Sequence, residues 1–232
     1  MRAVPTTEQR TSGRRRRAEA RATVLRSALA LAENSQFSDL TVDEIARAAG
    51  ISRSAFYQHY HDKQDLLHAA VEEVAGDLYE MAERWWRGEG AAPAELVRNA
   101  LAGVVSVWTE HASLLRVVIE VSGYGEDVRE TWFGIVQRFI DATAEHLTSE
   151  QRRGLVPDQL DPTAAAEALV WGVERVCYIY ISRAGRSPEE VVEQLTTVWV
   201  AALYPGVVPA SELRPEGQTG SIWGVPTPEF DS

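Results

Sequence analysis

Polar side chains occupy the outward positions of a short predicted helix over residues 53–59. The side chains at those positions are Arg53, Ser54, Tyr57 and Gln58. An arginine can form two hydrogen bonds with a guanine edge, and Ser54 or Gln58 can pair with other bases in the major groove. The segment therefore has the chemistry needed to recognise a sequence in double-stranded DNA.

Groups suited to phosphate oxygens lie in and directly after the same helix. Tyr57, Tyr60, His61 and Lys63 are such groups, and the first amides of the next helix could add a phosphate site. Phosphate contacts fix a protein on DNA without carrying sequence information. His61, like His59, is equally consistent with an ordinary surface histidine.

Large aromatic rings project from four predicted helices of the remaining chain, namely Trp108, Trp132, Phe139, Trp171, Tyr178 and Trp199. Such rings often line apolar ligand sites, although the same rings can pack into a solid core. Val136 and Val170 extend the set, and Thr143 and Glu174 could orient a ligand. An ion pair of Glu174 with Arg175 or with a neighbouring chain is an equal alternative. We expect a cavity for a small apolar or amphipathic ligand.

Three predicted helices position the polar segment. Apolar residues at helical spacing predict a first helix over residues 16–34. Thr41 and Glu44 form a capping box that begins a second helix, and Gly50 ends it. Ser52 is a suitable N-cap for the third helix. Because the turn between the second and third helices is short, the pattern predicts a helix-turn-helix.

The rest of the chain predicts six more helices, and the sequence contains no strand pattern and no repeat. Asp62 begins a long fourth helix, and the others cover about 94–111, 113–121, 127–148, 162–184 and 188–204. The helix over 162–184 is apolar on almost all sides, so two of its faces must be buried against other helices. We therefore predict an all-α protein of about nine helices that forms a homodimer through helices 162–184 and 188–204.

Composition divides the chain into four predicted parts. Residues 1–15 form a flexible basic arm, 16–62 the DNA-binding domain, 63–204 the ligand-binding and dimerisation domain, and 205–232 a proline-rich disordered tail. The net charge is -11, yet residues 1–63 carry +4 and residues 64–232 carry -15. DNA contact must therefore be confined to the first quarter, although a basic tail on an acidic enzyme would give the same distribution.

Several classes of protein are not expected from this sequence. It has one cysteine, Cys177, and neither a secretion signal nor an apolar run long enough for a bilayer. We expect a cytoplasmic, nucleoid-associated protein without membrane contact. HExxH, GxSxG and glycine-rich phosphate-loop motifs are absent, so we predict no enzyme activity, no cofactor and no metal.

Residues 41–67 closely resemble the TetR family of transcriptional repressors. They match the family pattern T-x-x-x-I-A-x-x-A-G-(V/I)-S-x-x-x-(F/L)-Y-x-(H/Y)-(F/Y)-x-x-K-x-x-L at every fixed position. The resemblance implies that Arg53 and Ser54 approach the bases. It implies backbone contacts from Thr41, Ser52, Tyr57, His59 or Tyr60, and Lys63.

The larger domain resembles one subgroup of that family more loosely. The order of Trp132, Phe139, Thr143, Glu174 and Trp199 is similar to the subgroup that includes the mycobacterial regulator EthR, in which an elongated apolar cavity runs through the domain. We therefore expect a repressor that a small apolar ligand releases from a palindromic operator. Control by a protein partner without a small-molecule inducer, and activation instead of repression, are the alternatives.

Overall fold

The computed structural model describes residues 7–88 and 92–206, and within them it is helical without a strand. The elements in chain order are α1 (Thr7–Ala32), η1 (Phe37–Asp39), α2 (Val42–Ala48), α3 (Arg53–Phe56), α4 (Lys63–Arg87), α5 (Pro93–Glu110), α6 (Ala112–Ser122), α7 (Glu126–Arg152), α8 (Pro162–Cys177), η2 (Tyr178–Arg183) and α9 (Pro188–Leu203). Here η1 is a 3-10 helix and η2 is π-helical. The predicted all-α fold of about nine helices is confirmed.

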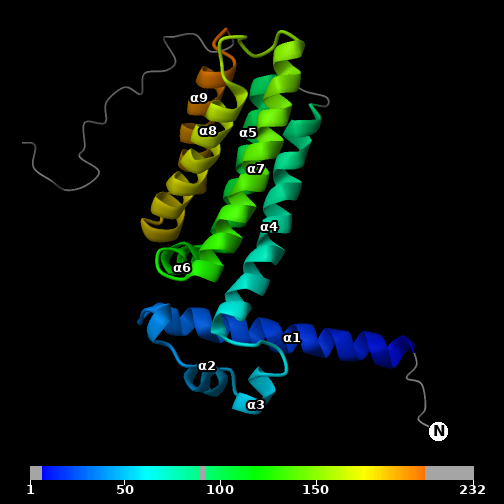
Figure 1. The fold of residues 1–232 in the computed structure, drawn as a ribbon, viewed down its shortest axis with the longest axis vertical. Coiled ribbons are helices and arrows are strands. Elements are labelled where there is room, and N and C mark those ends of the chain that lie inside the picture. Colours follow the sequence, from blue (N-terminus) through cyan, green and yellow to red (C-terminus); the bar gives the residue numbers. More distant parts are fainter. Residues whose placement is uncertain (1–6, 89–91, 207–232) are drawn as a thin grey trace, which may run out of the picture.

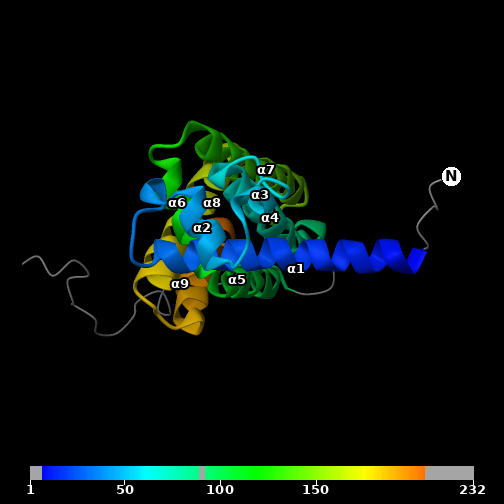
Figure 2. The same ribbon diagram turned by 90° about the horizontal axis from the view of Figure 1, so that it is seen from below.

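The helices form a small N-terminal unit at one end of a long bundle (Figure 1). Helix α1 crosses the end of the bundle, with α2 and α3 beside it, as the view along the bundle in Figure 2 shows. Helix α4 begins in the N-terminal unit and then packs against α5 and α7, while α8 packs on α7 and α9 on α5. Helix α4 is therefore the element that joins the N-terminal unit to the bundle.

Short-range hydrogen bonds set the ends of the helices around the turn. The Thr41 hydroxyl accepts from the Glu44 amide at 3.2 Å, and the Glu44 carboxylate accepts from the Thr41 amide at 2.8 Å. Ser52 accepts from the amide of Ala55 at 3.1 Å, and Asp62 accepts from two amides at the start of α4. The capping box and both other predicted N-caps are thus confirmed.

Two predicted helices differ in extent from the observed ones. Residues 7–15 of the predicted flexible arm belong to α1, whereas residues 1–6 and most of the predicted tail, 207–232, lie outside the described residues. Residues 7–15 contain arginine, glutamate and glutamine, which favour helix, but no apolar stripe, so hydrophobic periodicity did not predict this first part of α1. The third helix ends at Phe56 and continues as turns, earlier than the predicted 59.

The predicted eighth helix over residues 162–184 is also interrupted. α8 ends at Cys177 and is followed by the π-helical segment η2. In a π-helix the hydrogen bond spans one additional residue, which shifts the pattern of inward positions. A periodicity of 3.6 residues cannot detect such a shift.

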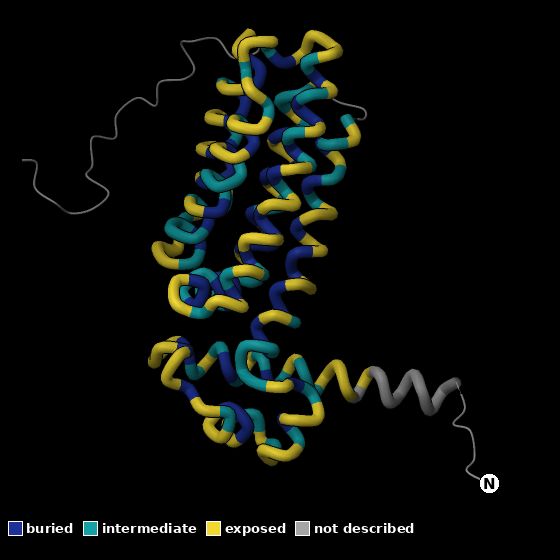
Figure 3. Tube along the Cα trace, viewed as in Figure 1, coloured by how far each residue is buried: buried dark blue, intermediate teal, exposed yellow. Residues whose placement is uncertain are grey.

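Buried residues follow the inner side of each bundle helix, as Figure 3 shows. Helices α4 and α5 approach each other closely at Gly103, where an added Cβ would lie 2.9 Å from both Cβ and Sδ of Met81. Among the described residues no single helix is long and apolar enough to cross a membrane; α5 and α6 pass that test only jointly, as a pair bent by 85°.

We expect Gly103→Ala to lower the free energy of unfolding by about 1–3 kcal/mol, because overpacking forces α4 and α5 apart. Gly134→Ala on α7 is the matched control, since its added Cβ meets no atom within 4 Å. That control should be neutral or stabilising by up to ~1 kcal/mol, because alanine favours helix over glycine. Thermal and urea unfolding measure both variants, and equal stabilities would contradict the close approach.

Candidate DNA-binding surface and ligand cavity

Arg53 lies on the exposed face of α3 and is held by two neighbours. Its Nη1 donates to Asp43 Oδ2 on α2 at 2.8 Å, and its Nη2 donates to the Tyr57 hydroxyl at 3.4 Å. The hydrogen bond with Tyr57 and the charge of Asp43 raise the pKa of the Arg53 guanidinium. The arginine is thus a permanent, oriented cation at the surface of the helix-turn-helix.

The other exposed residues of the predicted DNA set surround Arg53. Ser54, Tyr57 and Gln58 are exposed, with Tyr57 at 47%. Thr41 and Ser52 are also exposed, although their hydroxyls already accept the N-cap hydrogen bonds of α2 and α3. The structure therefore brings these predicted residues together on one surface.

Tyr60 and His59 face the interior more than predicted. Tyr60 is 5% exposed, its hydroxyl donates to the Arg21 carbonyl at 3.4 Å, and the Arg21 guanidinium lies 4.7 Å from the centre of its ring. His59 is half-buried, and burial lowers its pKa. The predicted phosphate contact of Tyr60 is corrected accordingly, because this hydroxyl faces α1.

The Lys63 ammonium is directed to backbone carbonyls of the protein and not, as predicted, to a position where it could contact a phosphate. The ammonium donates to the carbonyls of Phe37 at 3.0 Å, Leu40 at 2.7 Å and Ser38. Since an ammonium has three protons, all of them are used within the protein. Burial lowers the pKa of Lys63. In this geometry Lys63 clamps the first residue of α4 to η1 and offers no proton to a phosphate.

We expect Lys63→Met to destabilise the fold by about 2 kcal/mol, because it removes charged hydrogen bonds to three carbonyls. The salt dependence of DNA binding should keep its slope. Loss of a phosphate contact would instead make the slope shallower by ~0.9 while leaving stability unchanged. Arg53→Met is the control for stability, because it removes an exposed cation whose ion pair with Asp43 should contribute little to the stability of the fold.

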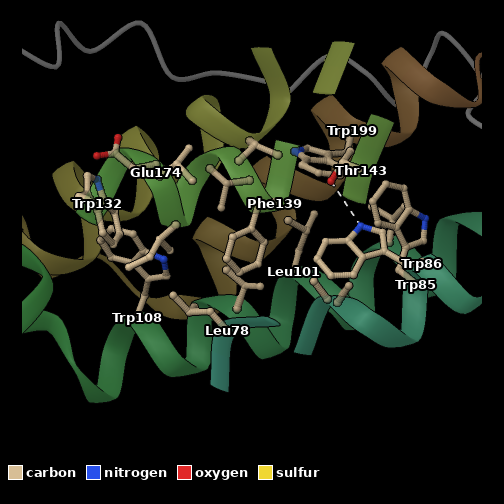
Figure 4. Close-up of a pocket in the computed structure, with 18 residues that line it drawn as sticks. Leu78, Trp85, Trp86, Leu101, Trp108, Trp132, Phe139, Thr143, Glu174 and Trp199 are labelled. Atoms are coloured by element: carbon tan, nitrogen blue, oxygen red, sulfur yellow. Dashed lines mark hydrogen bonds between the residues drawn. The ribbon is translucent and has the colours of Figure 1, made fainter. Parts of the chain in front are cut away.

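A cavity of about 80 Å³ lies inside the bundle between α4, α5, α7, α8 and α9 (Figure 4). Eight of the ten predicted ligand residues line it: Trp108, Trp132, Val136, Phe139, Thr143, Val170, Glu174 and Trp199. The wall that α4 and the first part of α5 form was not predicted; its residues are Leu78, Ala82, Trp85, Trp86, Val97, Ala100, Leu101 and Val104. Ile135 on α7 and Val173 on α8 also line the cavity and were not predicted. Their helical stripes were visible in the sequence, but their direction towards the cavity was not.

Trp171 and Tyr178 do not line the cavity, which corrects two predicted ligand contacts. Trp171 meets Phe133 edge to face with ring centres 5.4 Å apart, and the guanidinium of Arg175 lies 5.3 Å from the centre of the Tyr178 ring. Trp171 follows the lining residue Val170 directly, but its ring packs against Phe133 of α7 and does not line the cavity.

A polar network that the sequence analysis missed lies beyond one end of the cavity. Thr143 accepts from Trp86 Nε1 at 3.3 Å, and His146 Nδ1 lies 2.9 Å from the Trp86 carbonyl oxygen. Glu150 pairs with His146 at 3.5 Å and accepts from the Tyr204 hydroxyl. Although burial raises the pKa of Glu150, these hydrogen bonds hold it below its usual range. The i,i+4 spacing of His146 and Glu150 was the only available signal.

The opposite end of the cavity holds Glu174 and Trp132. Glu174 is 5% exposed, and burial raises its pKa. Arg175 Nε lies 3.5 Å from Glu174 Oε2, so the predicted ion pair is present at one oxygen. The cavity is thus apolar along its length with polar groups at both ends.

A helix-turn-helix with an exposed arginine, joined by one helix to a bundle with an internal cavity, defines a DNA-binding transcriptional regulator. Comparison with protein families identifies the family of regulators to which the chain belongs. The model for bacterial regulatory proteins of the tetR family matches residues 24–70, and that for the C-terminal domain of the transcriptional regulator EthR matches residues 97–205. The chain belongs to the TetR family of transcriptional regulators, and it is not an enzyme.

Individual relatives agree with this assignment. The HTH-type transcriptional regulator EthR of Mycolicibacterium smegmatis is 28% identical over 190 residues, covering 81% of this chain and 87% of the relative. EthR of Mycobacterium tuberculosis is also 28% identical, over 78% of this chain and 85% of the relative. Among solved structures, a TetR-family regulator from Syntrophomonas wolfei has a TM-score of 0.68 at 15% identity. The match covers 83% of this chain and 98% of that regulator. The fatty acid degradation regulator FadR of Bacillus halodurans also has a TM-score of 0.68 at 15% identity. This match covers 79% of this chain and 96% of FadR. These structures share the fold.

Proposed function

We propose that this regulator is a repressor that leaves a palindromic operator when a small apolar or amphipathic ligand enters the bundle cavity. The observation that supports it is the course of α4. Its first residue, Lys63, is clamped to η1 of the N-terminal unit, and residues 78–86 near its other end line the cavity. A displacement of α4 by a ligand would therefore move the helix-turn-helix.

Contacts between α4 and α7 favour a lever-like response of α4. His68 Nδ1 lies 2.7 Å from Thr131 Oγ1, and the Arg138 guanidinium donates to Glu72 at 3.3 Å. Both pairs are exposed and lie between the DNA-binding unit and the cavity. Exposed pairs contribute little energy, so they can exchange partners when α4 tilts against α7.

The proposed DNA contacts follow from the exposed surface. Arg53, Ser54 and Gln58 approach the bases, and Thr41, Ser52, Tyr57 and His59 approach the phosphates. Arg53 must exchange Asp43 for a base edge when it binds, since its guanidinium is shared with that carboxylate in the free chain. Asp43 thus keeps the arginine oriented and opposes non-specific contact with phosphates.

Two chains are needed to bind a palindrome with half-sites about one DNA turn apart. The outer faces of α8 and α9 are the proposed interface, because they expose apolar groups that a monomer leaves in water. Val198 on α9 is 55% exposed, and Phe133 on α7, whose ring meets Trp171 of α8, is 49% exposed. An isologous contact through these faces would cover both.

We expect Arg53→Ala to lower affinity for the operator upstream of the chain's own gene by about 1–3 kcal/mol and to relax sequence preference. Arg98→Ala is the matched control, because Arg98 is an exposed cation on α5 paired with Glu193. Operator titrations at several salt concentrations measure both variants. An unchanged preference in Arg53→Ala would contradict base contact by this residue.

We expect a medium-chain ketone, 2-nonanone, to lower operator affinity by a factor in the typical range of ~5–150 for a coupling of ~1–3 kcal/mol. Ala100→Leu fills part of the cavity from α5 and should keep DNA binding while losing the response. Fluorescence anisotropy of labelled operator measures both. Unchanged DNA affinity at saturating ketone would favour control by a protein partner instead.

A further inference from the structure

An outer groove of about 470 Å³ lies between α4 and α7, beside the ligand cavity. These two helices pack side by side (Figure 1). The residues that line the outer groove are Glu72, Ala75, Gly76, Tyr79, Arg138, Phe139, Asp141, Ala142 and Glu145. Among the described residues, Phe139 alone lines both the outer groove and the cavity, where Figure 4 shows its ring. The side chain of Phe139 therefore separates the two spaces.

Three aromatic rings in contact form the partition between the outer groove and the cavity. The centre of the Phe139 ring lies 5.4 Å from that of Tyr79 and 5.8 Å from that of Trp86, and the centres of Tyr79 and Trp86 are 4.6 Å apart. Tyr79 is 39% exposed and lines the outer groove, whereas Trp86 lines the cavity. At Phe139, which is half-buried, the partition is therefore a single ring.

Phe139 is the ring of this partition that can move aside at the lowest cost. Trp86 is held by the hydrogen bond from its Nε1 to Thr143 at 3.3 Å, and Phe139 can form no comparable bond. Small residues, Gly76 and Ala142, line the outer groove next to Phe139, and an added Cβ at Gly76 would meet no atom within 4 Å. Rotation of a side chain is much faster than a shift of whole helices. The cavity can thus open here without separation of α4 from α7.

We infer that the outer groove is the site where the ligand docks before it enters the cavity, and that Phe139 is the gate between them. This inference rests on the proposed ligand cavity. Another groove between α4 and α7, lined by residues such as His68 and Thr131, shares no described residue with the cavity. The shared ring therefore distinguishes the outer groove as the route.

Charged side chains make the outer groove selective for neutral and cationic ligands. Glu72, Asp141 and Glu145 are three carboxylates and Arg138 is one guanidinium, which gives a net charge of -2. All four residues are exposed, and Arg138 already pairs with Glu72 at 3.3 Å. Since that pair is neutral, Asp141 and Glu145 set the sign of the potential at the entrance. An amphiphile with an ammonium head group is attracted there, and one with a carboxylate is repelled.

Stopped-flow tryptophan fluorescence with 2-nonanone tests the route, because five tryptophans line the cavity. We expect Gly76→Phe, which places a ring in the outer groove, to slow association and dissociation by the same factor of roughly ten and to leave Kd unchanged. An obstacle outside the cavity raises one barrier for both directions. Ala102→Phe is the matched control, because Ala102 is an exposed residue of α5 outside the outer groove. Equal association rates in these two variants would overturn the inference.

Phe139→Ala tests the gate itself. We expect it to speed the association of 2-nonanone by roughly tenfold, because the ligand no longer waits for a ring to rotate. Leu101→Ala is the control, since Leu101 lines the cavity and not the outer groove and should alter mainly dissociation. The same association rate in both variants would contradict a gate at Phe139. Gly76→Phe keeps the route testable if Phe139→Ala does not fold.

Ionic strength tests the selectivity of the entrance. Between ~10 mM and ~500 mM salt, the association rate of octylammonium should fall and that of octanoate should rise, because salt screens the carboxylates. Glu145→Gln should weaken both trends. Opposite trends would overturn the selectivity. If 2-nonanone gives neither a fluorescence change nor heat with wild type, the proposed ligand cavity is itself contradicted. Binding that Gly76→Phe does not slow contradicts the entrance alone.

Discussion

The clamp between Lys63 and the carbonyls of Phe37, Ser38 and Leu40 is the interaction on which the rest of the structure depends. It fixes the start of α4 to the unit that carries the helix-turn-helix. Without this charged contact, the long helix and the DNA-binding unit would be joined mainly by apolar packing, which is non-directional. Three hydrogen bonds from one ammonium define an orientation, so the direction of α4 determines the position of α3.

The parts of this arrangement that depend on residues close together in the chain could be predicted from the sequence. Thr41, Ser52 and Asp62 were recognised as N-caps because a cap bonds to amides two or three residues away. The lining residues of α7 and α8 were found through helical periodicity and the resemblance to a known family. The TetR assignment itself rested on one continuous stretch of motif.

Contacts between residues far apart in the chain could not be predicted from the sequence. Lys63 reaches back 23 to 26 residues, and nothing in its position distinguishes a clamp from a phosphate contact. Tyr60 was misjudged for the same reason, since its partner Arg21 lies 39 residues earlier. The α4 wall of the cavity was missed because periodicity shows that a stripe is buried, but not which neighbour covers it.

The small volume of the cavity bears on the mechanism. Drug-sized ligands occupy pockets of about 300–1,000 Å³, whereas this cavity holds about 80 Å³ between rings in contact, such as Trp85 and Trp199 with centres 5.3 Å apart. A ligand that fitted without moving these rings would favour the present conformation of the bundle and would not displace α4. Because Trp85 and Trp86 belong to α4, their displacement acts on the clamped helix. A tight cavity therefore couples a ligand to DNA more strongly than a preformed one would.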